Sequence, residues 1–73
     1  MQQLAIIEGI RRYTIHGEPY VVIYYSDGAD RETIHQAQMS EDSLPAGLRV
    51  GDSVVLTMIG SVVAGVHKER AEG

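Results

Sequence analysis

The residue types best suited to binding a ligand or a partner gather in the first third of the chain. They are one arginine and three tyrosines, which we call the candidate surface: Arg11, Tyr13, Tyr20 and Tyr24. A loop over residues 16–19 separates the first two from the last two, and alternate residues of a strand point to the same face. The four side chains are therefore predicted to share one face of a two-stranded hairpin.

The predicted register of this hairpin places Ile15 opposite Tyr20, Tyr13 opposite Val22 and Arg11 opposite Tyr24. The other face would then carry the remaining residues of interest: Arg12, Ile23 and Tyr25. The second strand of the hairpin, residues 20–26 (YVVIYYS), is apolar on both faces. One set of tyrosines must therefore lie outside the core or beneath a partner.

Two kinds of partner fit this surface. Tyrosines beside an arginine on a barrel sheet can stack the bases of single-stranded nucleic acid. However, ten acidic against six basic residues give a net charge of -4, which opposes a polyanion. A protein partner or a second copy of the chain could cover the same apolar area without positive charge, and a homodimer is the leading prediction.

Catalytic and metal chemistry find little support in the sequence. The five serines lie at predicted turns or strand starts, and none is in a G-x-S-x-G motif. The three histidines, His16, His35 and His67, lack the spacing of a ligand pair, and the absence of cysteine removes thiolate sites. We expect no enzymatic activity, no metal and no cofactor.

The elements that must position the candidate surface are strands. Val, Ile, Thr and Tyr dominate the apolar content, and strands are predicted over residues 4–15, 20–26, 29–39, 53–59 and 62–67. Gly9 is a natural site for a bulge or bend, and Pro19 is expected to end the ladder before the second strand. Asp27-Gly28 and Gly60-Ser61 are typical of hairpin turns.

The segment 29–39 is the ambiguous one, because its pattern also fits a mediocre helix and hence a ββαββ sheet. A strand is favoured, since Asp-Gly after a strong strand is typical of a hairpin turn, which leads into a second, paired strand. Ser40-Glu41-Asp42 then looks like the start of a short helix that Pro45 stops. The predicted fold is all-β: a small five-stranded antiparallel barrel, OB-like or alternatively SH3-like, with one short helix between strands 3 and 4.

A fragment before the last hairpin resembles parts of two known families. Gly47-Leu48, Gly51-Asp52 and Val54 are similar to the end of the molybdate-binding barrel modules of transport ATPases, although the family's Lys is missing at Ile59-Gly60-Ser61. The fragment is also similar to the hairpin of swapped-hairpin regulators that bind DNA as dimers. A motif shared by two unrelated families indicates a common turn into a strand, so neither is assigned; a small oxyanion-binding barrel stays an alternative.

Residues 1–67 are predicted to form a single domain, and residues 68–73 (KERAEG) a frayed tail. No secretory signal or membrane segment is visible, so a cytoplasmic location without membrane contact is expected. The predicted function is that of a non-enzymatic binding or assembly module that acts through a β surface and self-associates. The alternative is an OB-type module that binds single-stranded nucleic acid.

Overall fold

The chain folds into one antiparallel sheet. The structure is a computed structural model and describes residues 1–69. Its elements, in chain order, are β1 (Gln2–Ile15), β2 (Glu18–Asp27), β3 (Asp30–Ser40), the 3-10 helix η1 (Glu41–Ser43), β4 (Ser53–Ile59) and β5 (Val62–Lys68). The strand predictions are confirmed, including the ambiguous third one, which is extended and pairs with β2 along most of its length.

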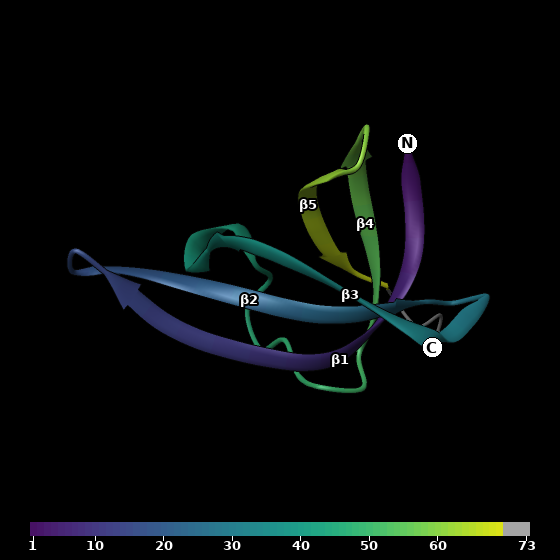
Figure 1. Ribbon diagram of the computed structural model, residues 1–73, viewed down its shortest axis with the longest axis horizontal. Helices are drawn as coiled ribbons and strands as arrows, with labels where there is room; N and C mark the ends of the chain where they lie inside the picture. The colour runs from purple at the N-terminus through teal and green to yellow at the C-terminus, as the bar shows by residue number, and fades with distance from the viewer. Residues whose placement is uncertain (70–73) are drawn as a thin grey trace.

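The spatial order of the strands is β3-β2-β1-β4-β5. The first half of β1 pairs with β4, and most of its length pairs with β2. The register of β1 against β2 shifts between Ile7 and Gly9, which confirms the predicted bulge. Figure 1 shows the result: the β1–β2 hairpin extends as a long arm, while β4 and β5 rise at its other end beside the N-terminus.

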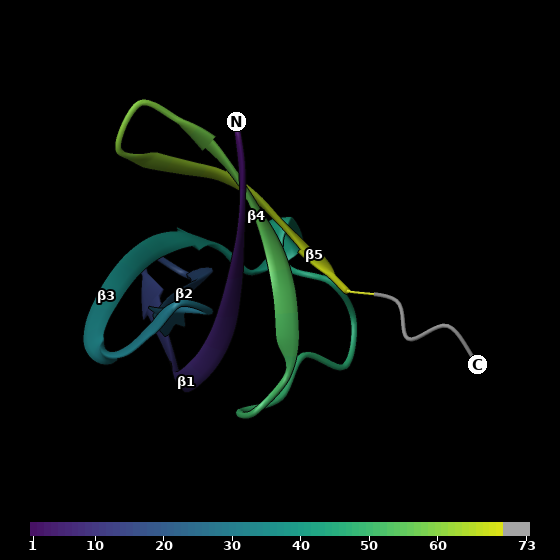
Figure 2. The same ribbon diagram turned by 90° about the vertical axis from the view of Figure 1, so that its right-hand side faces the viewer.

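The predicted barrel is wrong in one respect, because the sheet does not close. In the strand order, β3 and β5 are the two edges, and they are not paired with each other within residues 1–69. In Figure 2, β3 curls around the left of the molecule, whereas β5 runs above it from the upper left to the right. A closed barrel requires the ends of the sheet to meet. The fold is therefore an all-β, curled and open five-stranded sheet, and neither the OB-like nor the SH3-like form is confirmed.

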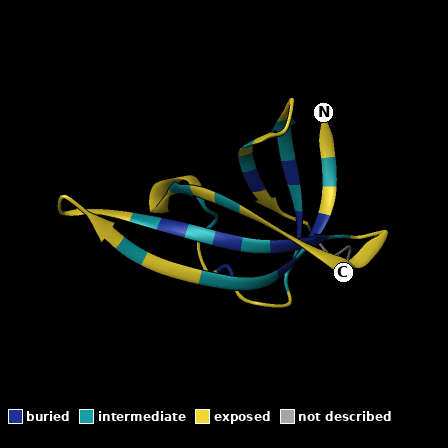
Figure 3. Ribbon diagram, in the orientation of Figure 1, coloured by how far each residue is buried: buried dark blue, intermediate teal, exposed yellow. Residues whose placement is uncertain are grey.

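The core lies on the inner face of this curl. Its buried members are Ala5, Ile7, Val21, Ile23, Tyr25, Leu48, Val54, Leu56 and Val66. Figure 3 shows that burial is concentrated in the middle of β2 and β4, whereas β3 is exposed over most of its length. Val54 and Leu56 are fully buried, as the alternation of the last hairpin predicts.

The segment between β3 and β4 differs from the prediction. The short helix is a single 3-10 turn over Glu41–Ser43, and Ser40 makes no side-chain cap. The fragment that resembles two families forms a turn: the Asp52 amide donates to the Arg49 carbonyl over 3.1 Å, with Gly51 at φ 96. Gly51 N–H donates to the Ile7 carbonyl over 2.7 Å, which attaches the turn to β1. These residues therefore have a structural role.

The C-terminal end of the described chain is paired further than predicted. Lys68, the first residue of the expected tail, is the last residue of β5, and the Glu69 amide donates to the Ser53 carbonyl over 3.0 Å. The rest of that tail, 70–73, lies outside the described residues. Within residues 1–69 no helix has the length and apolar character needed to cross a membrane.

Candidate binding surface

The turn between β1 and β2 sets which residues lie opposite one another. It contains two residues, His16 at φ 51 and Gly17 at φ 82. Positive φ at both positions is the signature of a type I′ hairpin turn, whose twist matches that of the strands. The predicted four-residue loop is thus wrong, and Pro19 continues the ladder, opposite Thr14.

The observed register is displaced by two residues from the predicted one. Arg11 lies opposite Val22, Tyr13 opposite Tyr20, and Gly9 opposite Tyr24. A displacement of two residues, unlike one of a single residue, leaves every side chain on its face. The four residues of the candidate surface therefore lie on one side of the β1–β2 hairpin, which we call the outer face, opposite the core.

Tyr13 and Tyr20 form the centre of this face. Their rings are stacked, with centroids 6.1 Å apart and planes inclined by 24°. Both side chains are half-buried, and the Tyr20 hydroxyl donates to Glu18 Oε2 over 3.3 Å. A half-exposed aromatic pair of this kind offers apolar area and hydroxyl groups to a partner at low cost in side-chain entropy.

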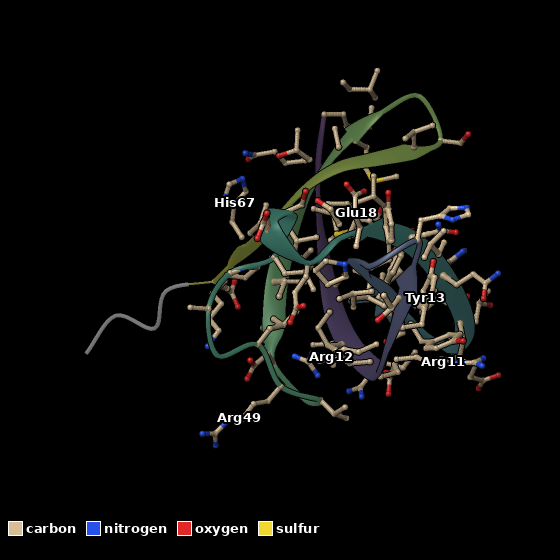
Figure 4. All side chains as sticks on the ribbon, turned by 90° about the vertical axis from the view of Figure 1, so that its left-hand side faces the viewer. Arg11, Arg12, Tyr13, Glu18, Arg49 and His67 are labelled. Atoms are coloured by element: carbon tan, nitrogen blue, oxygen red, sulfur yellow. The ribbon has the colours of Figure 1, made fainter. Side chains whose placement is uncertain are left out.

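Arg11 lies beside this pair at a hollow of the surface. The hollow has a volume of about 280 Å³ and is lined by Arg11, Tyr13 and Val22. Arg11 makes no ion pair with any of residues 1–69. Arg12, its neighbour, points to the opposite side of β1 (Figure 4), where its Nε lies 3.5 Å from Glu41 Oε1. Arg11 is therefore the cation of the outer face that is open to a partner.

Tyr24 lies on the same face but has a different role. A Cβ atom placed on Gly9 would lie 3.2 Å from Tyr24 Cδ2, so the ring of Tyr24 packs over the bare backbone of the bulge. The ring fills the space that a side chain at position 9 would take. The structure thus places Arg11 and Tyr13 at the hollow, with Tyr20 stacked on Tyr13, and places Tyr24 on the same face as a packing residue.

Two residues that the sequence did not single out extend the outer face. Ile15 and Glu18 lie opposite each other at the end of the hairpin, one row beyond Tyr13 and Tyr20. Ile15 is 39% exposed, and Glu18 forms no ion pair within the described chain. Strand alternation already places Ile15 on this face, whereas Glu18 joins it once the turn is known to contain only two residues.

A polar cluster at the bulge was also missed. The Ser26 hydroxyl, fully buried, donates to Glu8 Oε2 over 2.5 Å, and Arg31 Nε and Nη2 donate to the same oxygen, each over 3.2 Å. These hydrogen bonds, that of Ser26 first, and the charge of Arg31 lower the pKa of Glu8. The cluster ties the bulge of β1 to β2 and β3.

The histidines lie in three separate places. His16 is in the first turn, His67 lies opposite Val55 on β5, and His35 stacks on Tyr25 with ring centroids 5.4 Å apart. Burial raises the pKa of the Tyr25 hydroxyl. Within residues 1–69 no group of three or more His, Asp or Glu side chains is arranged to hold a metal ion.

Comparisons with known proteins give a fold and no family. No family model matches the chain, and no relative was found among curated proteins. The structure is similar to an X-ray crystal structure of DUF2500 from Klebsiella pneumoniae, with a TM-score of 0.72 and 15% sequence identity. The match covers 97% of this chain and 99% of that chain. At this identity the similarity shows a shared fold only.

Proposed function

We propose that this protein is a non-enzymatic binding and assembly module that self-associates through the outer face of β1 and β2. The observation that carries the proposal is the stacked, half-exposed pair of Tyr13 and Tyr20, 6.1 Å apart, beside Arg11, which has no ion-pair partner within residues 1–69. Interface centres are enriched in tyrosine and arginine, because both combine apolar area with directional polar groups.

The charge balance favours a copy of the chain over a polyanion. The chain as a whole carries a net charge of -4. On the outer face the positive charge of Arg11 is offset by the negative charge of Glu18, one row beyond the tyrosines. Apolar contact between two such faces needs no net positive charge, whereas non-specific binding to phosphates does.

Sedimentation velocity over concentrations from about 1 µM to about 1 mM tests the proposal, since the population of a dimer with a dissociation constant in this range changes across it. We expect the sedimentation coefficient to rise with concentration, and we expect Tyr13→Ala to abolish the rise. Ile59→Ser is the matched control, because Ile59 is 70% exposed but lies at the end of β4. A parent protein that stays monomeric at the highest concentration would overturn the proposal.

The hollow beside Arg11 supports a second candidate, the binding of single-stranded nucleic acid. A cation next to tyrosine rings is the arrangement on which unpaired bases stack. Titration with a labelled oligonucleotide separates the two candidates, because release of counterions makes nucleic-acid binding steeply salt-dependent. Tight, salt-sensitive binding by a monomer, lost in Tyr13→Ala, would favour this candidate over assembly.

A further inference from the structure

We infer that the partner of the outer face is a second copy held in an antiparallel two-fold arrangement, in which Arg11 of each subunit pairs with Glu18 of the other. The inference rests on the proposed function and specifies the geometry of that interface. Its basis is the arrangement of charge on the face. Arg11 and Glu18 are opposite in sign, have no ion-pair partner in the described chain, and flank the tyrosine pair.

Three successive rows across β1 and β2 make up the relevant part of the face. They are Arg11 with Val22, Tyr13 with Tyr20, and Ile15 with Glu18. Arg11 is on β1 in the first row, and Glu18 is on β2 in the third. Adjacent rows on one face are about 7 Å apart and strands about 4.8 Å apart. The tyrosine row therefore lies midway between the two charges.

Two sheet faces related by a two-fold axis can stack with their strands antiparallel or parallel. When the axis runs across the strands along the tyrosine row, the Arg11 row of one copy lies over the Ile15–Glu18 row of the other. Arg11 then stands over Ile15 and reaches Glu18, about one strand spacing (about 4.8 Å) to the side. The operation repeats the contact, so the dimer contains two such pairs.

The parallel alternative brings like charges together. When the axis runs along the strands, each row lies over its own copy, so that Arg11 faces the Arg11 end of the partner and Glu18 faces the Glu18 end. Like charges opposed in an interface are strongly unfavourable. The charge pattern of the face therefore selects the antiparallel arrangement.

Local contacts prepare the two charged side chains for this role. The Tyr20 hydroxyl donates to Glu18 Oε2 over 3.3 Å, which holds the carboxylate next to the tyrosine row. The aliphatic part of Arg11 can lie on Ile15, which is 39% exposed, while its guanidinium stays at the rim. The interface would thus have four tyrosines at its centre and charge pairs at its edge, the usual arrangement of a specific contact.

The area of the face indicates that the dimer is weak. Two strands by three rows cover roughly 10 Å by 20 Å, from strand spacing and rise. That is well below the roughly 800 Å² that each partner buries in a standard interface. We therefore expect a dimer that dissociates on dilution, in which loss of the charge pairs has a measurable effect.

Charge exchange between the two positions tests the inference. Arg11→Glu and Glu18→Arg should each weaken self-association by about tenfold or more, because each places like charges together twice. An equimolar mixture of the two variants should form a heterodimer, since the acidic face of one variant then meets the basic face of the other. The variant that carries both substitutions should dimerise like the parent. Arg49→Glu, a charge reversal of an exposed residue in the loop before β4, should have no effect.

The outcomes distinguish the inference from the function on which it rests. If the parent dimerises and Tyr13→Ala prevents it, but the mixture of the two charge variants stays monomeric, the antiparallel pairing is wrong and the assembly module stands. If the parent is monomeric throughout, both fail. Equal melting temperatures of the dilute variants would show that the fold is intact in each.

Discussion

The two faces of β2 are made from similar residues and have opposite surroundings. Val21, Ile23 and Tyr25 point inward and are 0%, 0% and 6% exposed. Tyr20, Val22 and Tyr24 point outward and are all half-buried. Hydrophobicity therefore does not distinguish the core from the candidate surface in this strand. The difference comes from β4, β5 and the loop to β4, whose Val54, Leu56, Val66 and Leu48 cover the inner face.

The largest effect on stability is expected when neighbouring side chains on the two faces of β2 are truncated and compared. Ile23→Ala removes a fully buried side chain and should lower the free energy of unfolding by about 2–5 kcal/mol. Val22→Ala should lower it by less than about 1 kcal/mol, since Val22 packs on one side only. Urea unfolding of the dilute proteins measures both. Equal losses would show that the outer face belongs to a second core.

An intermediate effect is expected at Ser26, a residue on the outer side of β2 that is nevertheless fully buried. Its hydroxyl, together with Arg31, lowers the pKa of Glu8 below the ordinary 4.5. A lowered carboxyl pKa stabilises the fold above the pKa of the unfolded chain, and this stabilisation is lost as the pH falls through the folded value. Ser26→Ala should therefore unfold more easily than the parent at about pH 7, with the difference shrinking toward about pH 3.

Thermal unfolding at a series of pH values gives this comparison. Thr14→Ala, in an exposed position of β1, is a matched loss of one hydroxyl and should show no such pH dependence. A difference between Ser26→Ala and the parent that is constant with pH would mean that the hydroxyl acts through packing and not through Glu8.

A smaller effect is expected at the bulge, where the outer face depends on a missing side chain. Gly9→Ala places a Cβ atom 3.2 Å from Tyr24 Cδ2, so the ring must shift. With Tyr24 present, the strain of moving its ring should offset the stability gained when alanine reduces the conformational entropy of the unfolded chain. In a Tyr24→Ala background, Gly9→Ala should stabilise by about 0.5 kcal/mol. A double-mutant cycle by urea unfolding measures the coupling, and additive effects would exclude the packing role of Tyr24.

The smallest effect on stability is expected from the two adjacent arginines, which lie on opposite faces of β1. Arg12→Ala removes an exposed ion pair with Glu41 and should cost less than about 0.5 kcal/mol. Arg11→Ala removes no ion pair within the described chain, so it should leave the dilute protein unchanged and weaken only its self-association. Parallel unfolding and sedimentation experiments separate the two, and a loss of self-association in Arg12→Ala would show that the interface lies on the other face.

Much of the fold follows from local signals in the sequence. The β-branched runs mark the strands, and Gly9 marks the bulge. The faces of Arg11, Tyr13, Tyr20 and Tyr24 follow from alternation, which tolerates an error of two residues in register. The predicted register itself was wrong, because His16 adopts a positive φ that few residues other than glycine favour.

Closure of the sheet and the polar cluster at the bulge could not be read from the sequence. Whether β3 meets β5 depends on the accumulated twist and length of five strands, and no single residue encodes it. The contact of Ser26 with Glu8 requires the bulge to turn Glu8 toward β2, although the two residues are distant in the chain. The hollow at Arg11, Tyr13 and Val22 likewise depends on the register that the turn sets.

The double pairing of β1 also implies an order of events during folding. The end of β1 pairs with residues close in the chain, since Ile15 lies opposite Glu18. The start of β1 pairs with residues far along the chain, since Gln2 lies opposite Thr57. Short loops close faster and at lower entropic cost than long ones. The β1–β2–β3 meander should therefore form first. The start of β1 then serves as the strand on which β4 pairs, followed by β5. Pulse-labelling hydrogen exchange should then show protection of the β2 amides before those of β5. Water should leave the core only at the last step, when β4 and β5 cover the inner face.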